Sequence, residues 1–375
     1  MRIVYMRSNP INPYPRAEKE MSAAINSGHS TIALAWNRRV EKKGITKSIL
    51  ILNKNKRVPI LRFNIKAEFG QGLSNILPLI KWQFQLMKWL YKNRKNYDLI
   101  HAYDFDTVLP ALLMKIFFKK KYIYDICDFY IDAFHVPKFI KPLIKKMDFL
   151  AINKAEKTIL VNETRLSQIK GSKPKEIVFI HNTPIDTNIK YEKCMSFSKP
   201  TIFYGGILSD RRMILETIEI CKRHKEWNLF IAGYGRLEKE CEKAANNYKN
   251  IKFIGKKNYD EIINYTRKAT VIFACYDPSV PNHKYSSPNK LYEAMMCGKP
   301  IVVSKDTGVD ELVVSEKIGI SCNYNEQSLE EAYSYLLNNR DISEEMGSRA
   351  RKLYDEKYNW EIMENRIEEM YKTIK

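Results

Sequence analysis

Residues 286–304 read SSPNKLYEAMMCGKPIVVS, a stretch that combines the start of a helix, its end and a following strand. Ser287 is a favourable N-cap, and Pro288 suits the first helical position because a backbone N–H would have no partner there. Gly298 can close the helix, and a short turn then leads into the apolar strand IVVS. A helix that runs directly into a buried strand is the repeating unit of a parallel α/β sheet.

The same stretch carries groups that suit a nucleotide. We expect the backbone N–H groups of Asn289, Lys290 and Leu291 to point out of the helix start, where the helix dipole favours an anion. Lys290 adds a full positive charge, and Glu293 lies one turn further on the same face. A carboxylate there can accept hydrogen bonds from two neighbouring hydroxyl groups. The pattern indicates a diphosphate and ribose site, although a well-capped helix with a surface Lys–Glu pair would show the same residues.

The rest of the chain alternates apolar, β-rich runs with helical patterns. Most of these runs are continuous, which is typical of parallel strands covered on both faces. In chain order they are RIVYM, TIALAW, DLIHAY, KYIYDI, KTILV, EIVFI, TIFYGG, WNLFIAG, IKFIG, TVIFAC, KPIVVS and IGISC. Repeated alternation of strand and helix predicts doubly wound parallel sheets.

The chain has 375 residues, enough for two domains. The polar stretch KYEKCMSFSKP at 190–200 is the predicted linker, so we expect Rossmann-like domains at 1–190 and 198–357. The last helix, within 359–375, is expected to pack back on the first domain. Ligands of open α/β sheets bind beyond the carboxyl ends of the strands, which predicts an active site in a cleft between the two domains.

Cysteine usage and apolar runs limit the cellular location. The seven cysteines include no CxxC pair, which indicates reduced thiols in a cytosolic protein. The N-terminal MRIVYMRSNP lacks the apolar centre of a signal peptide. No apolar run approaches the ~20 residues that a spanning helix requires. We therefore expect a cytoplasmic protein that is soluble or peripherally attached to a membrane.

The positive charge is unevenly distributed. The net charge is +20, of which residues 1–190 carry +19 and residues 191–375 carry +1. Within the basic half, KIFFKKKYIY and VPKFIKPLIKKMDFL mix lysines with apolar residues, as surfaces that bind anionic lipid do. The pattern favours peripheral attachment to the inner face of the cell membrane, with a solvated charged face as the alternative.

The stretch SPNKLYEAMMCGKPIV resembles the donor-site helix of family 4 glycosyltransferases, which have the GT-B fold of two facing Rossmann-like domains. Further segments resemble the family in chain order, and together they cover nearly the whole chain. They are RSNPINPYPRAEKEMSAAINSGHSTIALAW, YDLIHAYDFDTVLPAL, YIYDICDFY, IVFIHNTPID, FYGGILSDRRMILETI, LFIAGYG, IKFIGK and NWEIMENRIEEMY.

This resemblance implies that the second domain binds a nucleotide-sugar donor. Glu293 would hold the ribose hydroxyls, and the turn at 287–290 would hold the diphosphate. Tyr234 and Lys256 would lie near the base, although structural roles are the better explanation for both. The donor-binding residues implied are Gly205, Gly206, Arg211, Arg212, Ser287, Pro288, Asn289, Lys290 and Glu293.

Candidates on the first domain follow strand ends or the loop after the first strand. The catalytic candidates are His101, Asp104 and Asp128, and the acceptor-side candidates are Asn12 and Arg16. His101 is equally well explained as a buried structural histidine, and Asp125 is a weaker candidate than Asp128. The chain departs from the family at Ser286, where many relatives have a glutamate, and at Tyr103, where many have a histidine.

The predicted activity is retaining transfer of a sugar from a nucleotide diphosphate to a glycan or lipid-linked glycan. Such a reaction depends mainly on electrostatic support of the leaving diphosphate. We expect no cofactor and no metal, because DFD at 104–106 falls in the first-domain segment rather than in a metal-binding context. The alternatives are a GT-B nucleotide-sugar epimerase and a basic nucleic-acid-binding protein. We predict no nucleic-acid partner.

Overall fold

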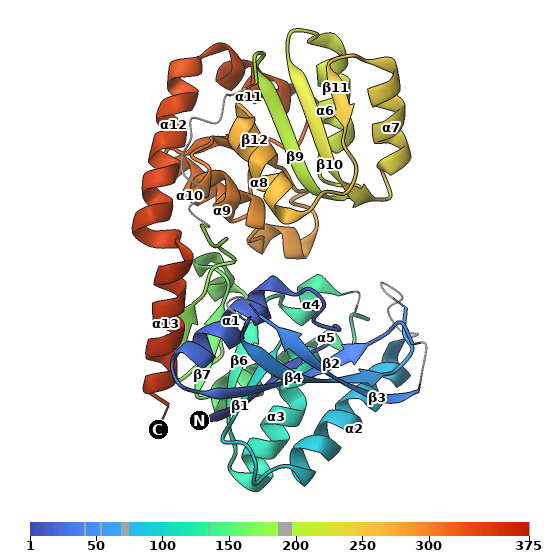
Figure 1. Ribbon diagram of the computed structural model, residues 1–375, viewed down its shortest axis with the longest axis vertical. Helices are drawn as coiled ribbons and strands as arrows, with labels where there is room; N and C mark the ends of the chain where they lie inside the picture. The colour runs from blue at the N-terminus through green and yellow to red at the C-terminus, as the bar shows by residue number, and fades with distance from the viewer. Residues whose placement is uncertain (41–42, 53–54, 69–74, 135, 187–196, 375) are drawn as a thin grey trace. The chain divides into compact units, whose positions relative to one another are not determined.

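The computed structural model describes residues 1–374 except 41–42, 53–54, 69–74, 135 and 187–196. The chain forms two compact units, one comprising Met1–His181 with Met363–Lys375 and the other Asn182–Ile362 (Figure 1). Of the predicted linker, residues 190–196 lie outside the described part of the chain. Residues from Met363 onward belong to the first unit, on which the last helix is expected to pack.

The described residues of the first unit form an eight-stranded sheet in the order β3-β4-β2-β1-β5-β6-β7-β8. Neighbouring strands are parallel except β3 and β4, which pair antiparallel at one edge. The strands are β1 (Arg2–Arg7), β2 (Ser30–Asn37), β3 (Gly44–Ile51), β4 (Arg57–Asn64), β5 (Leu99–Tyr103), β6 (Lys121–Ile126), β7 (Lys157–Leu160) and β8 (Ile177–Phe179).

Strands β3 and β4 are absent from the sequence-based prediction. β3 is exposed along almost its whole length, and the first residues of β4 alternate between exposed and buried around Pro59. Neither strand therefore shows the continuous apolar run by which the other strands were predicted.

Helices cover both faces of the first sheet, because alternate residues of a strand point to opposite faces. Val4 and Ile100 pack with α2, α3 and α5 in one core, whereas Tyr5 and His101 contact α1 and α13 on the other face. The helices are α1 (Pro15–Asn26), α2 (Ile76–Lys92), α3 (Phe105–Phe118), α4 (Tyr130–Ala133), α5 (Lys141–Lys154), the 3-10 helix η3 (Glu163–Ser167) and α13 (Trp360–Lys372).

The second unit contains a six-stranded parallel sheet in the order β11-β10-β9-β12-β13-β14. The strands are β9 (Thr201–Leu208), β10 (Asn228–Gly235), β11 (Ile251–Phe253), β12 (Val271–Ala274), β13 (Ile301–Ser304) and β14 (Gly319–Cys322). One core lies between this sheet and α6, α7 and α11, and a second lies between its other face and α8, α9, α10 and α12. The prediction of doubly wound parallel sheets in two domains is therefore confirmed.

The helices of the second unit up to α10 return the chain between successive strands, and α11, α12 and η5 follow the last strand, β14. They are α6 (Ile214–Arg223), α7 (Glu238–Asn247), α8 (Tyr259–Lys268), η4 (Pro281–Tyr285), α9 (Asn289–Met296), α10 (Val309–Ser315), α11 (Glu326–Asn338), α12 (Arg340–Leu353) and the π-helical η5 (Tyr354–Tyr358). In the described part of the chain, no helix combines the length and the apolar character needed to cross a bilayer.

Candidate functional site

The predicted donor helix α9 places a buried lysine beneath the end of β9. The Lys290 side chain is 8% exposed, and its ammonium lies 4.4 Å from the centre of the Tyr204 ring. At Gly206, whose φ is 155°, a Cβ atom would lie 2.7 Å from the Lys290 Nζ. Glycine at this position therefore leaves room for the ammonium as well as for the backbone turn.

Arg212 brings a second cation to the same place. Its guanidinium stacks 5.1 Å from the centre of the Tyr276 ring and hydrogen-bonds Tyr204. Among the described residues, neither Lys290 nor Arg212 has a carboxylate partner within ion-pair distance. Two neighbouring cations that lack such a partner create a positive potential suited to an anion.

Glu293 follows Lys290 by one helical turn and is equally buried, with 8% of its surface exposed. Its carboxylate accepts a hydrogen bond from Tyr259, and burial together with this carboxylate raises the pKa of the Tyr259 phenol. Lys290 and Glu293 line one small pocket with Gly205 and Phe203. The structure thus brings together the predicted lysine, glutamate and glycine turn.

The start of α9 differs from the prediction. The helix begins at Asn289 with Pro288 in the N-cap position, and the Ser287 hydroxyl lies 3.3 Å from the Tyr292 hydroxyl instead of capping a backbone amide. The Leu291 N–H donates to the Pro288 carbonyl at 3.0 Å, so it does not point out of the helix start. The Asn289 and Lys290 amides have no acceptor among the described residues, so two amides remain open for an anion where three were predicted.

The loop after β9 presents Arg211 to solvent. Its side chain is 61% exposed, lies 3.8 Å from Asp277, and belongs to a residue with a φ of 63°. Met213 also has a positive φ, of 53°. Non-glycine residues in this region are strained, and such strain is concentrated at functional sites.

The C-terminal end of β10 presents Tyr234 between two glycines. Its ring is 53% exposed, and Lys256 lies 5.3 Å from the ring centre. At Gly233, which has a φ of 144°, a Cβ atom would lie 1.8 Å from the Gly206 carbonyl oxygen. The two strands approach this closely because both positions lack a side chain.

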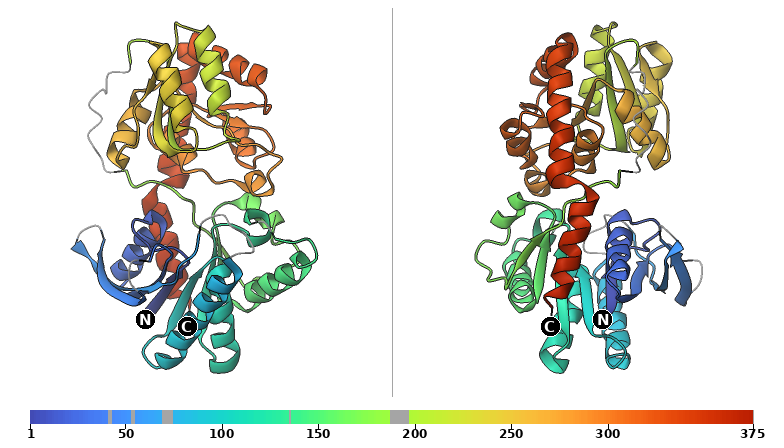
Figure 2. Two further views of the ribbon diagram at one scale, coloured as in Figure 1. Left: turned by 90° about the vertical axis from the view of Figure 1, so that its right-hand side faces the viewer. Right: turned by 60° about the vertical axis from the view of Figure 1, so that its left-hand side comes forward.

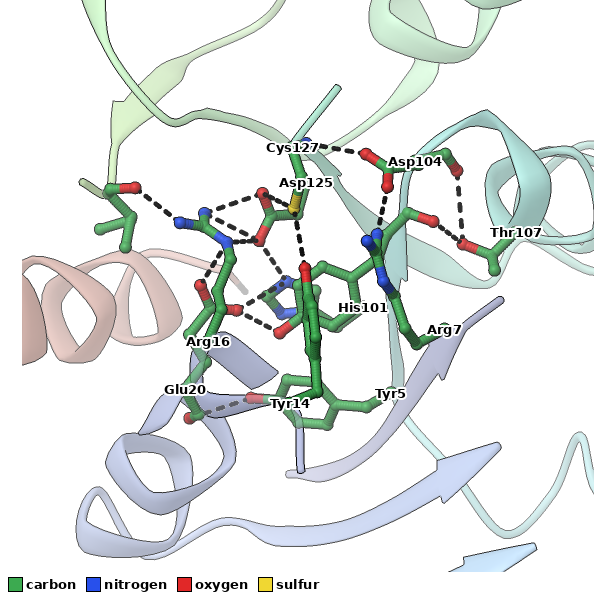
Figure 3. Close-up of polar contacts among 12 residues, drawn as sticks. Tyr5, Arg7, Tyr14, Arg16, Glu20, His101, Asp104, Thr107, Asp125 and Cys127 are labelled. Atoms are coloured by element: carbon green, nitrogen blue, oxygen red, sulfur yellow. Dashed lines mark hydrogen bonds and ion pairs between the residues drawn. The ribbon is translucent and has the colours of Figure 1, made fainter. Parts of the chain in front are cut away.

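In the first unit, three of the predicted residues, Arg16, His101 and Asp104, belong to a buried polar network (Figure 3). Asp104 occupies the N-cap position of α3 with a φ of 56°, and its carboxylate accepts hydrogen bonds from the backbone amides of Cys127 at 2.8 Å and Asp128 at 3.0 Å. The other carboxylate oxygen pairs with Arg7. With these three partners, Asp104 fixes the loop after β6 to the start of α3.

Arg16, predicted as an acceptor-side residue, is occupied by internal partners. Its guanidinium lies 2.9 Å from Asp125 and 3.2 Å from Glu20, and donates to the Ile180 carbonyl at 2.8 Å (Figure 3). Burial disfavours the charged form of Asp125, but Arg16 and His101 together outweigh it and lower the pKa of this carboxyl. The pKa of Glu20 is raised to about 7 by burial, against the effect of Arg16.

His101 lies in the interior of the first unit, with none of its surface exposed. Its ring stacks on Tyr5 at 4.7 Å, and its Nδ1 lies 3.0 Å from the Tyr371 hydroxyl. Its Nε2 lies 3.5 Å from both Glu20 and Asp125. These contacts favour the alternative of a structural histidine.

The remaining candidates differ in exposure. Asp128 is 46% exposed at its side chain and pairs with Arg165 at 3.2 Å, and Asn12 is exposed in the loop after β1. Of the two departures, Ser286 donates to the Thr307 carbonyl at 3.2 Å, and the buried Tyr103 donates to Glu20.

The network also contains Arg7, Glu20 and Tyr371, which the sequence patterns did not indicate. Glu20 and Tyr371 lie on helices where they read as ordinary helical residues, and Tyr371 meets Tyr5 across 366 positions of the chain. Polar residues at otherwise apolar positions of the helix faces are the signal that could have indicated them.

One group in the described part of the chain has the spacing of metal ligands. Atoms of Glu20, His101 and Asp125 lie within 4.8 Å of one another. The Arg16 guanidinium already forms ion pairs with the Glu20 and Asp125 carboxylates, so it supplies the positive charge that a metal ion would otherwise bring. Metal independence of the reaction stays a prediction.

The two doubly wound sheets define the class of the molecule, which has the GT-B fold. The chain superposes on sucrose-phosphate synthase from Thermosynechococcus elongatus with a TM-score of 0.75 and 15% identity, covering 100% of this chain and 99% of that chain. HepE from Anabaena, solved in complex with UDP, gives a TM-score of 0.70 at 15% identity over 100% of both chains. At 15% identity, these comparisons show a shared fold and nothing further.

Residues 198–353 match the family described as Glycosyl transferases group 1. Two uncharacterized glycosyltransferases of Methanocaldococcus jannaschii are 24% and 27% identical over 40% and 59% of this chain, and the matches span 41% and 57% of their lengths. One from Haemophilus influenzae is 23% identical over 91% of this chain and 95% of its own length. The second unit thus matches the glycosyl transferases group 1 family over residues 198–353, and the relatives' names support glycosyl transfer.

Proposed function

We propose that the protein is a retaining glycosyltransferase of the family 4 type, which takes its sugar from a nucleotide diphosphate. The observation that carries the proposal is a pair of cations beside the Tyr204 ring. Lys290 and Arg212 form this pair, and neither has a carboxylate partner among the described residues. The open amides of Asn289 and Lys290 add donors for the same anion. Glu293, in the pocket with Lys290, would hold the ribose hydroxyls.

The proposed reaction follows from this distribution of charge. The bond between the sugar and the diphosphate breaks, a bond to the acceptor oxygen forms on the same face of the sugar, and the acceptor proton passes to the departing diphosphate. Lys290 and Arg212 would stabilise the charge that develops on the diphosphate, which is the largest contribution such a site can make. No step requires a metal or a cofactor.

The acceptor and location are proposed from the first unit. Its buried network leaves Asp128 and Asn12 as the exposed candidates at the ends of strands, so these two would contact the acceptor. We propose a glycan or lipid-linked glycan as acceptor, because the first unit also carries the basic, apolar segments. The protein would then work in the cytoplasm at the inner face of the membrane.

Nucleotide binding tests the proposal. Thermal-shift screening with UDP, GDP, ADP and CMP sugars should give one series that stabilises the chain, with UDP-glucose the first to try because HepE is solved with it. Glu293→Ala, Lys290→Met and Arg211→Ala should each weaken nucleotide binding by about tenfold, since each removes a charged side chain that would contact the nucleotide. The exposed substitutions Lys305→Met and Glu311→Ala serve as matched controls.

Unchanged nucleotide affinity in all three site variants would contradict the site. Conversion of a nucleotide-sugar into its epimer without an acceptor would favour the epimerase alternative. Tight DNA binding that falls steeply with salt and ignores nucleotide would favour the nucleic-acid alternative.

A further inference from the structure

The outer face of α2 combines apolar and cationic side chains. Leu77, Ile80 and Phe84 follow at intervals of three and four residues, so they lie on one face of the helix. All three are exposed, Leu77 by 77% and Phe84 by 65%. Lys81 and Lys88 are exposed within the same stripe.

The C-terminal end of α3 extends this surface. Leu113, Ile116 and Phe117 are exposed there, Phe117 by 67%. The Phe118 ring lies 5.3 Å from the Tyr91 ring at the end of α2, so the apolar surface is continuous from one helix to the next. Figures 1 and 2 show the two helices side by side on one face of the first sheet.

Helix α5 packs against α3 and adds a third stripe. Leu143, Met147 and Leu150 are exposed at intervals of four and three residues, with Lys145 and Lys146 beside them. The outer surfaces of α2, α3 and α5 thus form one layer, which we call the α2–α3–α5 face.

This face carries only positive charge. The three helices contain two carboxylates, Asp106 and Asp148, and both are buried. The exposed charged side chains are those of Lys81, Lys88, Lys92, Lys145, Lys146 and Lys154. An exposed apolar surface that is rimmed by one sign of charge is unusual for a soluble monomer and marks an interaction surface.

We propose that the α2–α3–α5 face docks on an anionic phospholipid bilayer. Phe, Leu and Ile side chains insert at the boundary of headgroups and acyl chains, while lysines stay with the headgroup phosphates. A second copy of the chain is a poorer partner, because a symmetric contact would set lysines against lysines. Nucleic acid is also poorer, since aliphatic side chains gain nothing from a phosphate backbone. The inference concerns a surface outside the proposed donor site and does not depend on the proposed reaction.

Flotation with lipid vesicles tests the proposal on the full chain. The protein should float with vesicles of phosphatidylglycerol mixed with phosphatidylcholine and not with phosphatidylcholine alone. Lys81→Glu with Lys88→Glu should lower the affinity for anionic vesicles by roughly 30-fold or more. Each lysine accounts for about tenfold or less of this loss, and the loss should shrink at high salt. Phe84→Ser with Phe117→Ser should lower it by at least about tenfold at every salt concentration.

Matched controls lie on exposed positions of the second unit. Lys239→Glu with Lys243→Glu makes the same charge change, and Val314→Ser with Tyr335→Ser removes comparable apolar surface. Both pairs should leave vesicle binding within about twofold of the unsubstituted protein. UDP binding is measured on every variant, so that a lost membrane contact is distinguished from a failed donor site. If the phenylalanine pair unfolds, Leu77→Ser with Leu143→Ser replaces it.

Three results would overturn the proposal. The first is absence of flotation with anionic vesicles. The second is equal loss from both lysine pairs, or no loss from the apolar pair, since binding would then follow net charge alone. The third is a concentration-dependent dimer in sedimentation that Phe84→Ser with Phe117→Ser dissolves, which would assign the face to a second copy.

Discussion

At the scale of single residues, Gly233 shows how closely β9 and β10 approach. A Cβ atom there would lie 1.8 Å from the Gly206 carbonyl oxygen, so Gly233→Ala forces the strands apart as well as straining a φ of 144°. We expect a loss of about 3 kcal/mol or more in the free energy of unfolding. Gly255→Ala is the control: its φ is also positive, at 68°, but nothing lies near its Cβ, and it should cost about 1 kcal/mol. Urea denaturation compares the two, and equal losses would contradict the clash.

Asp148 predicts a dependence of stability on pH. Burial raises the pKa of its carboxyl to about 7, and its Oδ1 accepts from the Tyr124 hydroxyl at 2.6 Å. Because the folded pKa exceeds the ordinary value of 3.8, the folded state holds the proton between pH 4 and 7, and stability falls as pH rises through this window. Asp148→Asn removes the titrating carboxyl. The free energy of unfolding of this variant should therefore exceed that of the unsubstituted protein only slightly at pH 4, and by roughly 2 kcal/mol or more at pH 8. Denaturation at both pH values, with the exposed Glu240→Gln as control, measures this; a difference that does not change with pH would contradict it.

The residues that could be predicted from sequence are those whose chemistry is local. Lys290 and Glu293 lie one turn apart in a single helix, so the motif alone placed them together. Arg16 could not be assigned in this way, because its partner Asp125 lies 109 positions away and holds this predicted acceptor-side residue in an internal ion pair. The Ser287 cap failed for a smaller reason, since α9 begins one residue later than predicted.

At the scale of elements, the Tyr371 hydroxyl is one of the contacts that tie α13 to the first sheet. The Tyr371 hydroxyl lies 2.5 Å from the Tyr5 hydroxyl and 3.0 Å from the His101 Nδ1. Tyr371→Phe leaves the buried His101 nitrogen without this partner, so we expect a loss of about 1–3 kcal/mol in the free energy of unfolding. The exposed Tyr335→Phe is the matched control and should change stability by less than about 0.5 kcal/mol. A Tyr371→Phe protein as stable as this control would show that the hydroxyl contributes nothing.

Elements were predictable where they are buried on both faces. Each apolar run singled out in the sequence coincides with a strand, from β1 to β14, because parallel strands covered by helices must be apolar throughout. The edge pair β3 and β4 escaped prediction because the pattern of an exposed strand is set by its neighbours rather than by a core.

At the scale of the whole molecule, the two units have separate cores, and the proposed nucleotide groups all belong to the second. We expect calorimetry to show two unfolding transitions, of which the donor nucleotide raises only one. At a nucleotide concentration of 100 times the dissociation constant, the second unit should gain about 2.7 kcal/mol, because binding to the folded state alone stabilises by mass action. Glu293→Ala, with affinity lowered about tenfold, should reduce this gain to about 1.4 kcal/mol, whereas Tyr371→Phe should lower the other transition and leave the nucleotide shift intact. A nucleotide that raises both transitions equally, or a shift that Glu293→Ala leaves unchanged, would contradict the assignment of the donor site to the second unit.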